Sequence, residues 1–284
     1  MTRRCSERRL FLRPSRLLNA IFLYVLAAAA RRHGILVHAF CVLSNHCHLV
    51  LTDPRGELPS FMQYLDSLVA RAVNASLGRF EGFWATDGSY SAVEPIEQGD
   101  VLAKVAYVLA NPVAAGLVRR GRDWPGVWTE PAAIGGAPRL VARPKKFFRE
   151  DGPLPDLARL VLHRPPGFEN DDGFVETLAT LLAAAEDRAT AELEQKGRSF
   201  LGVAGVLRQK PFARPATGEP RRGLKPQVAC RNKWRRVELL LCVREFSRAH
   251  QKALEAWRAG IRDVLFPAGT WAMRVFHGVS CAPA

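Results

Sequence analysis

Three features are scarce in this chain of 284 residues: paired cysteines, long apolar runs and acidic side chains. Its six cysteines form no CxxC pair and no zinc-finger spacing, so we expect no disulfide framework and a reduced, cytoplasmic setting. The apolar run over residues 17–30 is too short to span a bilayer and ends at Arg31 and Arg32. We therefore expect no signal peptide and no membrane anchor.

The shortage of acidic residues leaves the chain strongly basic. The chain has 41 lysines and arginines but only 27 acidic residues, which gives a formal net charge of +14 at pH 7. The charge is uneven: residues 151–197 carry 10 acidic and 4 basic side chains, whereas residues 198–262 carry 4 acidic and 16 basic ones. Such an excess favours a polyanionic partner, either nucleic acid or an anionic membrane surface.

Hydrophobic residues make up 48% of the chain, which is enough for a buried core, and their spacing predicts an α+β fold. Strands are expected at residues 9–13, 35–43, 46–52 and 90–93, and helices at residues 14–32, 58–77 and 98–110. The order β-α-β-β-α-β-α is that of a ferredoxin-like, split βαβ antiparallel sheet with packed helices and one appended helix. The last of these helices is expected to end at Asn111 and Pro112, because a residue before proline disfavours the helical conformation.

The same patterns divide the chain into three segments. They are a first domain at residues 1–130, a linker with an acidic helix at residues 131–197, and a basic, mainly helical extension at residues 198–284. The Pro- and Gly-rich stretch 131–155 is the predicted linker, and the acidic helix is expected at residues 170–196. Residues 198–262 are expected to hold two or three helices.

Two histidines two residues apart form the first candidate site. If residues 46–52 are a strand, side chains alternate between its faces, so His46 and His48 leave on one face and Cys47 on the other. Same-face neighbours on a strand lie about 6.5–7 Å apart, close enough for both imidazoles to reach one divalent cation. The alternative is a pair of half-exposed histidines without a role. Four other histidines are not expected to touch this ion: His38, His163, His250 and His277.

The second candidate site lies on the polar face of the helix expected at residues 98–110. Lys104, Tyr107 and Asn111 follow one another at i, i+3 and i+7, which places them on one side of that helix. A tyrosine on such a face usually packs half-buried with its hydroxyl in water. Beside a cation and an amide, Tyr107 is predicted to be a nucleophile, with Lys104 as charge stabiliser and Asn111 as a metal ligand. Tyr90 is the second choice for the nucleophile.

Several motifs, in this order along the chain, carry a resemblance to a known family. They are residues 38–52, Phe83-Trp84, Tyr90-Ser91, Tyr107-Val-Leu-Ala-Asn-Pro-Val113, Gly116-Leu-Val118 and Asp123-Trp-Pro125. Over about residues 9–130 the chain resembles the Y1 tyrosine transposases of the IS200-like class, and more closely their REP-associated relatives.

The resemblance implies a His-hydrophobic-His endonuclease that cuts single-stranded DNA through a 5′-phosphotyrosine intermediate and uses Mg²⁺ or Mn²⁺. His46 and His48 match the metal-binding pair, and Tyr107 matches the nucleophile. Asn111 stands where shorter relatives have a glutamine ligand, and Cys47 is the residue between the histidines. The implied partner is single-stranded DNA containing a hairpin, bound by a monomer or a homodimer.

Two other functions stay open at this level. A DNA-binding protein of the same fold that does not cleave would use the same basic surface. A zinc hydrolase built on His46 and His48 is disfavoured, because no Asp or Glu base lies close to the pair in the sequence. Residues 198–262 are predicted to be an auxiliary DNA-binding module, with a solvated basic surface as the alternative. A chain ending near Thr129 is then expected to keep the chemistry.

Overall fold

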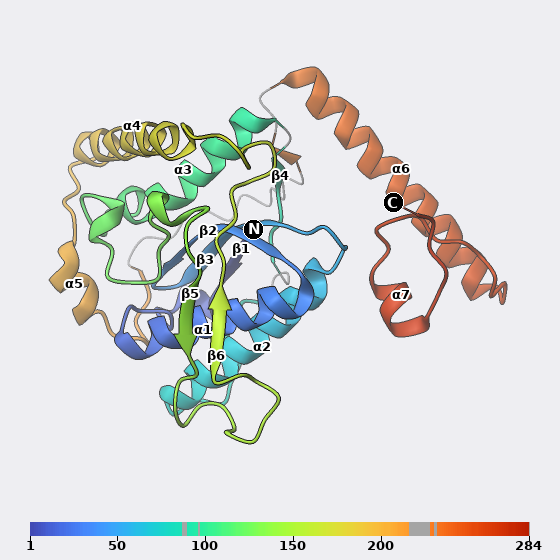
Figure 1. Cartoon of the computed structure of the whole chain (residues 1–284), viewed down its shortest axis with the longest axis horizontal. Helices are drawn as coiled ribbons and strands as arrows, with labels where there is room; N and C mark the ends of the chain where they lie inside the picture. Colours follow the sequence, from blue (N-terminus) through green and yellow to red (C-terminus); the bar gives the residue numbers. More distant parts are fainter. Residues whose placement is uncertain (87–89, 96, 216–227, 230–231, 284) are drawn as a thin grey trace.

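A computed structural model describes residues 1–86, 90–95, 97–215, 228–229 and 232–283 (Figure 1). The architecture is α+β, with helices around small, mainly antiparallel sheets. The elements in chain order are β1 (Thr2–Arg4), α1 (Arg16–His33), β2 (Leu36–Leu43), β3 (His46–Thr52), α2 (Leu58–Ser76), β4 (Glu94–Pro95), α3 (Gln98–Ala114), β5 (Arg139–Ala142), β6 (Leu157–Leu160), α4 (Phe174–Gln195), α5 (Gly202–Arg208), β7 (Val228–Ala229), α6 (Lys233–Arg258) and α7 (Ala272–His277).

The central sheet has the strand order β1-β3-β2, and β3 is antiparallel to both of its neighbours. The predicted strands at 35–43 and 46–52 are confirmed within one residue, as is the tight turn between them. A last strand was expected at residues 90–93. The structure reduces it to one antiparallel bridge, in which Ser91 and Thr2 exchange two backbone hydrogen bonds of 2.8 and 3.0 Å.

The prediction of a first strand at residues 9–13 is wrong. The first strand is Thr2–Arg4, which pairs with His46, Cys47 and His48 of β3. Residues 10–12 are buried, but their backbone bonds run to distant loops: the Leu10 amide donates to the Ala213 carbonyl, at 3.1 Å. Burial alone therefore accounts for the apolar run, and the true strand escaped notice because its residues are polar.

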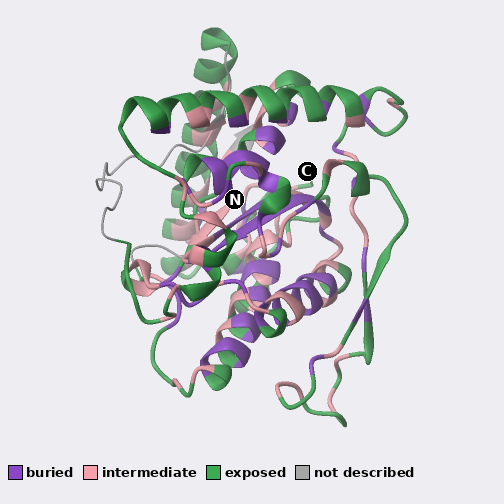
Figure 2. Cartoon of the chain, turned by 90° about the vertical axis from the view of Figure 1, so that its left-hand side faces the viewer, coloured by how far each residue is buried: buried purple, intermediate pink, exposed green. Residues whose placement is uncertain are grey.

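The sheet separates two hydrophobic clusters. Alternate residues of β2 and β3, among them Val42, Cys47 and Leu49, pack against α1 and α2. Cys41 and Leu43 belong to the opposite face, which packs against α3. Helix α4 lies on the outer side of α3, and its outward surface is exposed (Figures 1 and 2). The central strand β3 thus lies between two helical layers.

The ends of α1 follow the sequence prediction. The Ser15 side chain caps the helix by accepting from the Leu18 amide at 3.1 Å. Gly34 ends it in the left-handed conformation, with φ of 67°, which is available to glycine without strain.

Helix α3 does not end at Asn111 and Pro112 as predicted; it continues to Ala114. Proline lacks the amide that would bond the carbonyl of Val108 one turn earlier. The Asn111 side chain compensates, because its Nδ2 lies 2.7 Å from the Tyr107 carbonyl oxygen and 3.4 Å from that of Val108. A side-chain donor thus replaces the missing backbone donor, and the helix tolerates the proline.

Residues 131–155, the stretch expected to be a linker, are mostly exposed, but Ile134 and Val141 are buried. The stretch contains β5, which forms a hairpin with β6, and Val141, Ala158 and Leu160 are buried against α1. The acidic helix predicted at 170–196 is present as α4. Its Phe174 and Leu178 are buried in the α3 cluster.

The C-terminal part forms a small cluster of its own. Of the residues in the long helix α6, only Ala253 is buried, where it meets Phe266 and Met273. Trp271 connects this part of the chain to α2, because its Nε1 donates a hydrogen bond to Ser60 Oγ at 2.9 Å. Figure 1 shows α6 extending away from the sheet. Within the described residues, no helix combines the length and apolar character needed to cross a membrane.

Candidate active site

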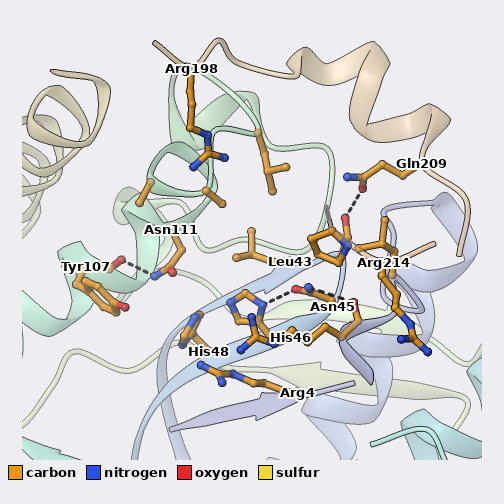
Figure 3. Close-up of a pocket in the computed structure, with 17 residues that line it drawn as sticks. Arg4, Leu43, Asn45, His46, His48, Tyr107, Asn111, Arg198, Gln209 and Arg214 are labelled. Atoms are coloured by element: carbon orange, nitrogen blue, oxygen red, sulfur yellow. Dashed lines mark hydrogen bonds between the residues drawn. The ribbon is translucent and has the colours of Figure 1, made fainter. Parts of the chain in front are cut away.

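A cavity of about 740 Å³ opens where the start of β3, helix α3 and residues 198–215 meet. His46, His48, Tyr107 and Asn111 all line it, so four of the five predicted site residues come together within one chain (Figure 3). Lys104, the fifth, lies outside the cavity lining, against the Tyr107 ring.

The two histidines leave the same face of β3, as their spacing predicted. Their ring centroids are 4.8 Å apart, and the rings are nearly perpendicular. His46 Nδ1 lies 2.6 Å from Asn45 Oδ1, and His48 Nδ1 lies 2.8 Å from Thr2 Oγ1. An amide oxygen accepts only, so His46 carries its proton on Nδ1 and leaves Nε2 with a free lone pair. With each Nδ1 held by an oxygen, both imidazoles are oriented as metal-binding histidines usually are.

Burial keeps both imidazoles neutral. Loss of hydration lowers the pKa of His46 to about 4, and the nearby charges of Arg4 and Arg8 act in the same direction. The pKa of His48 is also held well below its usual range, mainly by burial and then by His46. Near neutral pH the pair therefore offers lone pairs to a cation rather than protons.

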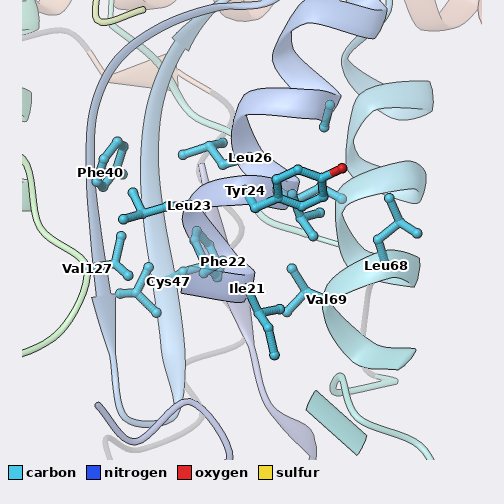
Figure 4. Packing of buried hydrophobic residues seen from close by; sticks show 14 of the residues in the cluster. Ile21, Phe22, Leu23, Tyr24, Leu26, Phe40, Cys47, Leu68, Val69 and Val127 are labelled. Atoms are coloured by element: carbon cyan, nitrogen blue, oxygen red, sulfur yellow. The ribbon is translucent and has the colours of Figure 1, made fainter. Parts of the chain in front are cut away.

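Cys47 points away from the cavity into the core between the sheet and α1 (Figure 4). Burial raises the pKa of its thiol to about 12, so it stays protonated and acts as a small apolar side chain. The alternation along β3 thus places the sulfur where it cannot ligate an ion held by His46 and His48.

Tyr107 faces the histidines from α3. Its ring centroid lies 6.2 Å from that of His48, and its side chain is 52% exposed, which leaves it accessible to a substrate. The Lys104 ammonium lies 4.7 Å from the centroid of the Tyr107 ring, a cation–π geometry. Partial burial lowers the pKa of Lys104.

The other three tyrosines lie outside the cavity. Tyr24 is buried, and its hydroxyl donates to the Pro155 carbonyl at 2.5 Å. Tyr64 packs beside His33, with ring centroids 5.6 Å apart. Tyr90, the alternative nucleophile, packs on the α1 and α2 side of the sheet, where burial raises its pKa. Tyr107 alone among the four lines the cavity.

The side chains of the cavity supply only part of the coordination sphere of a hard divalent cation. Among the described residues there is no cluster of three or more His, Cys, Asp or Glu side chains that would form a closed site. His46 and His48 supply two nitrogens. Because Asn111 Nδ2 is engaged with helix carbonyls, its Oδ1 is the amide atom left for the cavity. Such a set leaves coordination positions for water or a phosphate oxygen.

Six further residues that hold the histidines or bring charge to the cavity were not predicted from the sequence. Two of them, Thr2 and Asn45, hold the histidines. The other four are arginines that line the cavity: Arg4, Arg8, Arg198 and Arg214. Asn45 could have been noticed from its position next to His46, but the arginines come from segments far apart in the sequence and only the fold unites them.

His38, one of the histidines not expected to bind the ion, has a hydrogen-bond partner at each ring nitrogen. Nδ1 lies 2.9 Å from the His163 carbonyl oxygen, and Nε2 lies 2.8 Å from Thr52 Oγ1. It is buried and supports a bulge in β2, which is a structural role.

No protein-family model matches this chain, and no curated protein or solved structure shows significant similarity to it.

Proposed function

We propose that this protein is a metal-dependent endonuclease and strand transferase, of the transposase type, that acts on single-stranded DNA through a 5′-phosphotyrosine. One observation carries the proposal: Tyr107, the tyrosine that lines the cavity, faces His48, and His48 stands beside His46 with both Nδ1 atoms held. The ferredoxin-like fold is part of the proposal. The strand order β1-β3-β2, with Ser91 bridged to the outer edge of β1, is compatible with it.

His46 Nε2, His48 Nε2 and Asn111 Oδ1 would hold Mg²⁺ or Mn²⁺, which supplies Lewis acidity to a non-bridging phosphate oxygen when it is bound. Tyr107 is placed to attack the phosphorus. A bond forms between its phenolic oxygen and phosphorus, and the bond from phosphorus to the 3′ oxygen breaks. The phenol loses its proton and the departing oxygen gains one, so the products are a 5′-phosphotyrosine and a free 3′-hydroxyl.

The covalent link conserves the energy of the phosphodiester bond. A second 3′-hydroxyl can attack the phosphotyrosine, release Tyr107 and join two strands without a nucleotide cofactor. Lys104, over the face of the Tyr107 ring, stabilises the negative charge on the phenolate oxygen. The four cavity arginines favour the polyanionic backbone of DNA.

The test is covalent capture of DNA by the full chain. The protein is incubated with Mg²⁺ or Mn²⁺ and a panel of single-stranded hairpin oligonucleotides, then run on a denaturing gel. We expect a slower-migrating adduct that requires the metal and disappears in Tyr107→Phe and in His46→Ala.

The matched control is Tyr90→Phe, which removes the hydroxyl of the alternative nucleophile. It should keep the adduct, because Tyr90 packs on the opposite side of the sheet. An adduct retained by Tyr107→Phe but lost in Tyr90→Phe would assign the nucleophile to Tyr90. Salt-dependent DNA binding with no adduct on any oligonucleotide would favour the alternative, a DNA-binding protein that does not cleave.

A further inference from the structure

Arg198 reaches the cavity from the opposite side to the histidines. It lies three residues after Gln195, the last residue of α4, and its guanidinium points into the cavity toward Asn111 (Figure 3). Among the described residues, this guanidinium has no hydrogen-bond or ion-pair partner. An unpaired guanidinium at the rim of a cavity carries five donors that can bind an oxyanion.

The backbone around Arg198 is firmly attached to the helix that carries the candidate nucleophile. The Leu201 amide donates to the Gly116 carbonyl, and the Gly202 amide donates to the Leu117 carbonyl, both at 2.9 Å. Gly116 and Leu117 come directly after the end of α3. Arg198 is therefore held close to the end of the helix that carries Tyr107 and Asn111, although it lies 91 residues after Tyr107 in the sequence.

The charge inside the cavity has one sign. The four lining arginines come from two parts of the sequence, Arg4 and Arg8 from the first residues and Arg198 and Arg214 from the segment after α4. Arg214 lies beside Asn45, whereas Arg198 lies on the side of Asn111 (Figure 3). No carboxylate lines the cavity within the described residues. Glu7 lies outside the lining, where it pairs with Arg9 and Arg214 and so holds Arg214 against the N-terminal segment.

A single strand that entered the cavity would therefore meet cations on either side of the tyrosine and the histidines. We propose that Arg198 binds a phosphate of the single strand next to the one that Tyr107 attacks, across the cavity from Arg4 and Arg8. The inference rests on the proposed single-strand substrate. It assigns the first part of the basic segment to the active site itself rather than to a separate DNA-binding module.

The test uses the full chain and a fluorescein-labelled oligothymidylate of four nucleotides, short enough to report on the cavity. Fluorescence anisotropy is measured in EDTA, so that no cleavage takes place. We expect Arg198→Gln to raise the Kd about tenfold, because the charge-assisted hydrogen bonds to the phosphate are lost. Arg198→Lys, which keeps the charge but not the planar fork, should give an intermediate Kd.

Arg236→Gln is the matched control, because Arg236 is an exposed arginine on α6 that does not line the cavity. It should leave the Kd for the tetranucleotide within about twofold of the wild-type value, a change of less than roughly 0.5 kcal/mol. The Arg198 side chain is exposed, so its replacement is not expected to affect folding.

An unchanged Kd in Arg198→Gln, an equal loss in Arg236→Gln, or a wild-type protein that does not bind the tetranucleotide would each overturn the inference. The outcome is independent of cleavage, because binding is measured without metal. A failed covalent capture together with a specific loss of binding in Arg198→Gln would reject the proposed chemistry and keep Arg198 as a phosphate-binding residue.

Discussion

Thr2 Oγ1 lies 2.8 Å from His48 Nδ1, so the first strand of the sheet holds one of the two candidate metal-binding imidazoles. The backbone of Thr2 is itself fixed by two hydrogen bonds to Ser91. Thr2, a polar residue in the short edge strand β1, thus orients the His48 ring that lines the cavity.

We expect Thr2→Val to weaken binding of Mn²⁺ by about tenfold or more, the usual effect of losing a hydrogen bond behind a metal-binding histidine. Isothermal titration calorimetry on the full chain measures this affinity. Thr2→Ser should restore it, and Thr180→Val, on the exposed surface of α4, should have no effect. Equal affinities in Thr2→Val and the wild type would show that the hydrogen bond does not orient the ring.

Asn111 is expected to have two roles, one in the helix and one in the cavity. Its Nδ2 contacts two α3 carbonyls, one of which Pro112 leaves without an amide donor. We expect Asn111→Ala to lower the free energy of unfolding by about 1–2 kcal/mol, measured by urea denaturation.

The role of Asn111 in the helix can be separated by a double-mutant cycle with Pro112→Ala, which restores a backbone amide at position 112. In that background Asn111→Ala should cost less, because the Val108 carbonyl again has a backbone partner. An equal loss in both backgrounds would mean that the amide does not compensate for the proline. Asn111→Ala should also weaken the binding of Mn²⁺, because the amide oxygen is removed, and it should do so equally in both backgrounds.

Asp66 lies on α2, on the side of the sheet away from the cavity, and its carboxyl is expected to make the stability of the protein depend on pH. Burial raises the pKa of its carboxyl to about 7, although Arg3 Nε lies 2.9 Å from Oδ2 and opposes the shift. Since the native pKa exceeds the unfolded one, the native state binds more protons, and stability falls as the pH rises through about 7. We expect a loss of about 1 kcal/mol between pH 6 and pH 8 from this group.

Asp66→Asn should flatten this part of the pH profile, measured by urea denaturation at a series of pH values. Asp151→Asn is the control, because its carboxylate is exposed and pairs with the exposed Arg149. A profile that keeps its slope in Asp66→Asn would assign the pH dependence to other groups.

A chain ending at Pro215 should fold and keep the cavity, because every residue that lines the cavity precedes that point. It lacks 13 basic and 5 acidic side chains of residues 216–284. If about four of the basic ones contact phosphates, the log–log salt slope for long single strands should become shallower by about 3. The slope is measured by fluorescence anisotropy with a long oligothymidylate. An unchanged slope would show that the basic residues of the removed segment do not contact DNA.

A chain ending near Thr129 should behave differently from what the sequence suggested. It lacks Val141, Ala158 and Leu160, which are buried against α1, and Leu178, which is buried against α3. It also lacks Arg198. We expect a loss of stable folding, seen by circular dichroism, rather than a catalytic core with weaker DNA binding.

The sequence by itself determined the elements that carry the candidate site. The alternation of His46, Cys47 and His48 predicted one polar and one apolar face of β3. The spacing of Tyr107 and Asn111 predicted their common side of α3. Both patterns are local, because a strand repeats every two residues and a helix every 3.6, so neighbours in the sequence settle which side chains share a face.

Only the tertiary structure decided what surrounds those side chains. Thr2 lies in a strand without apolar alternation, and Arg198 lies after a helix of a different charge block, so neither has a local signal. Their positions depend on long-range backbone pairing, Thr2–Arg4 with β3 and Leu201–Gly202 with the end of α3. Hydrogen bonds between distant backbone segments form largely irrespective of side-chain type, and for this reason the walls of the cavity could not be predicted from the pattern of the residues that build them.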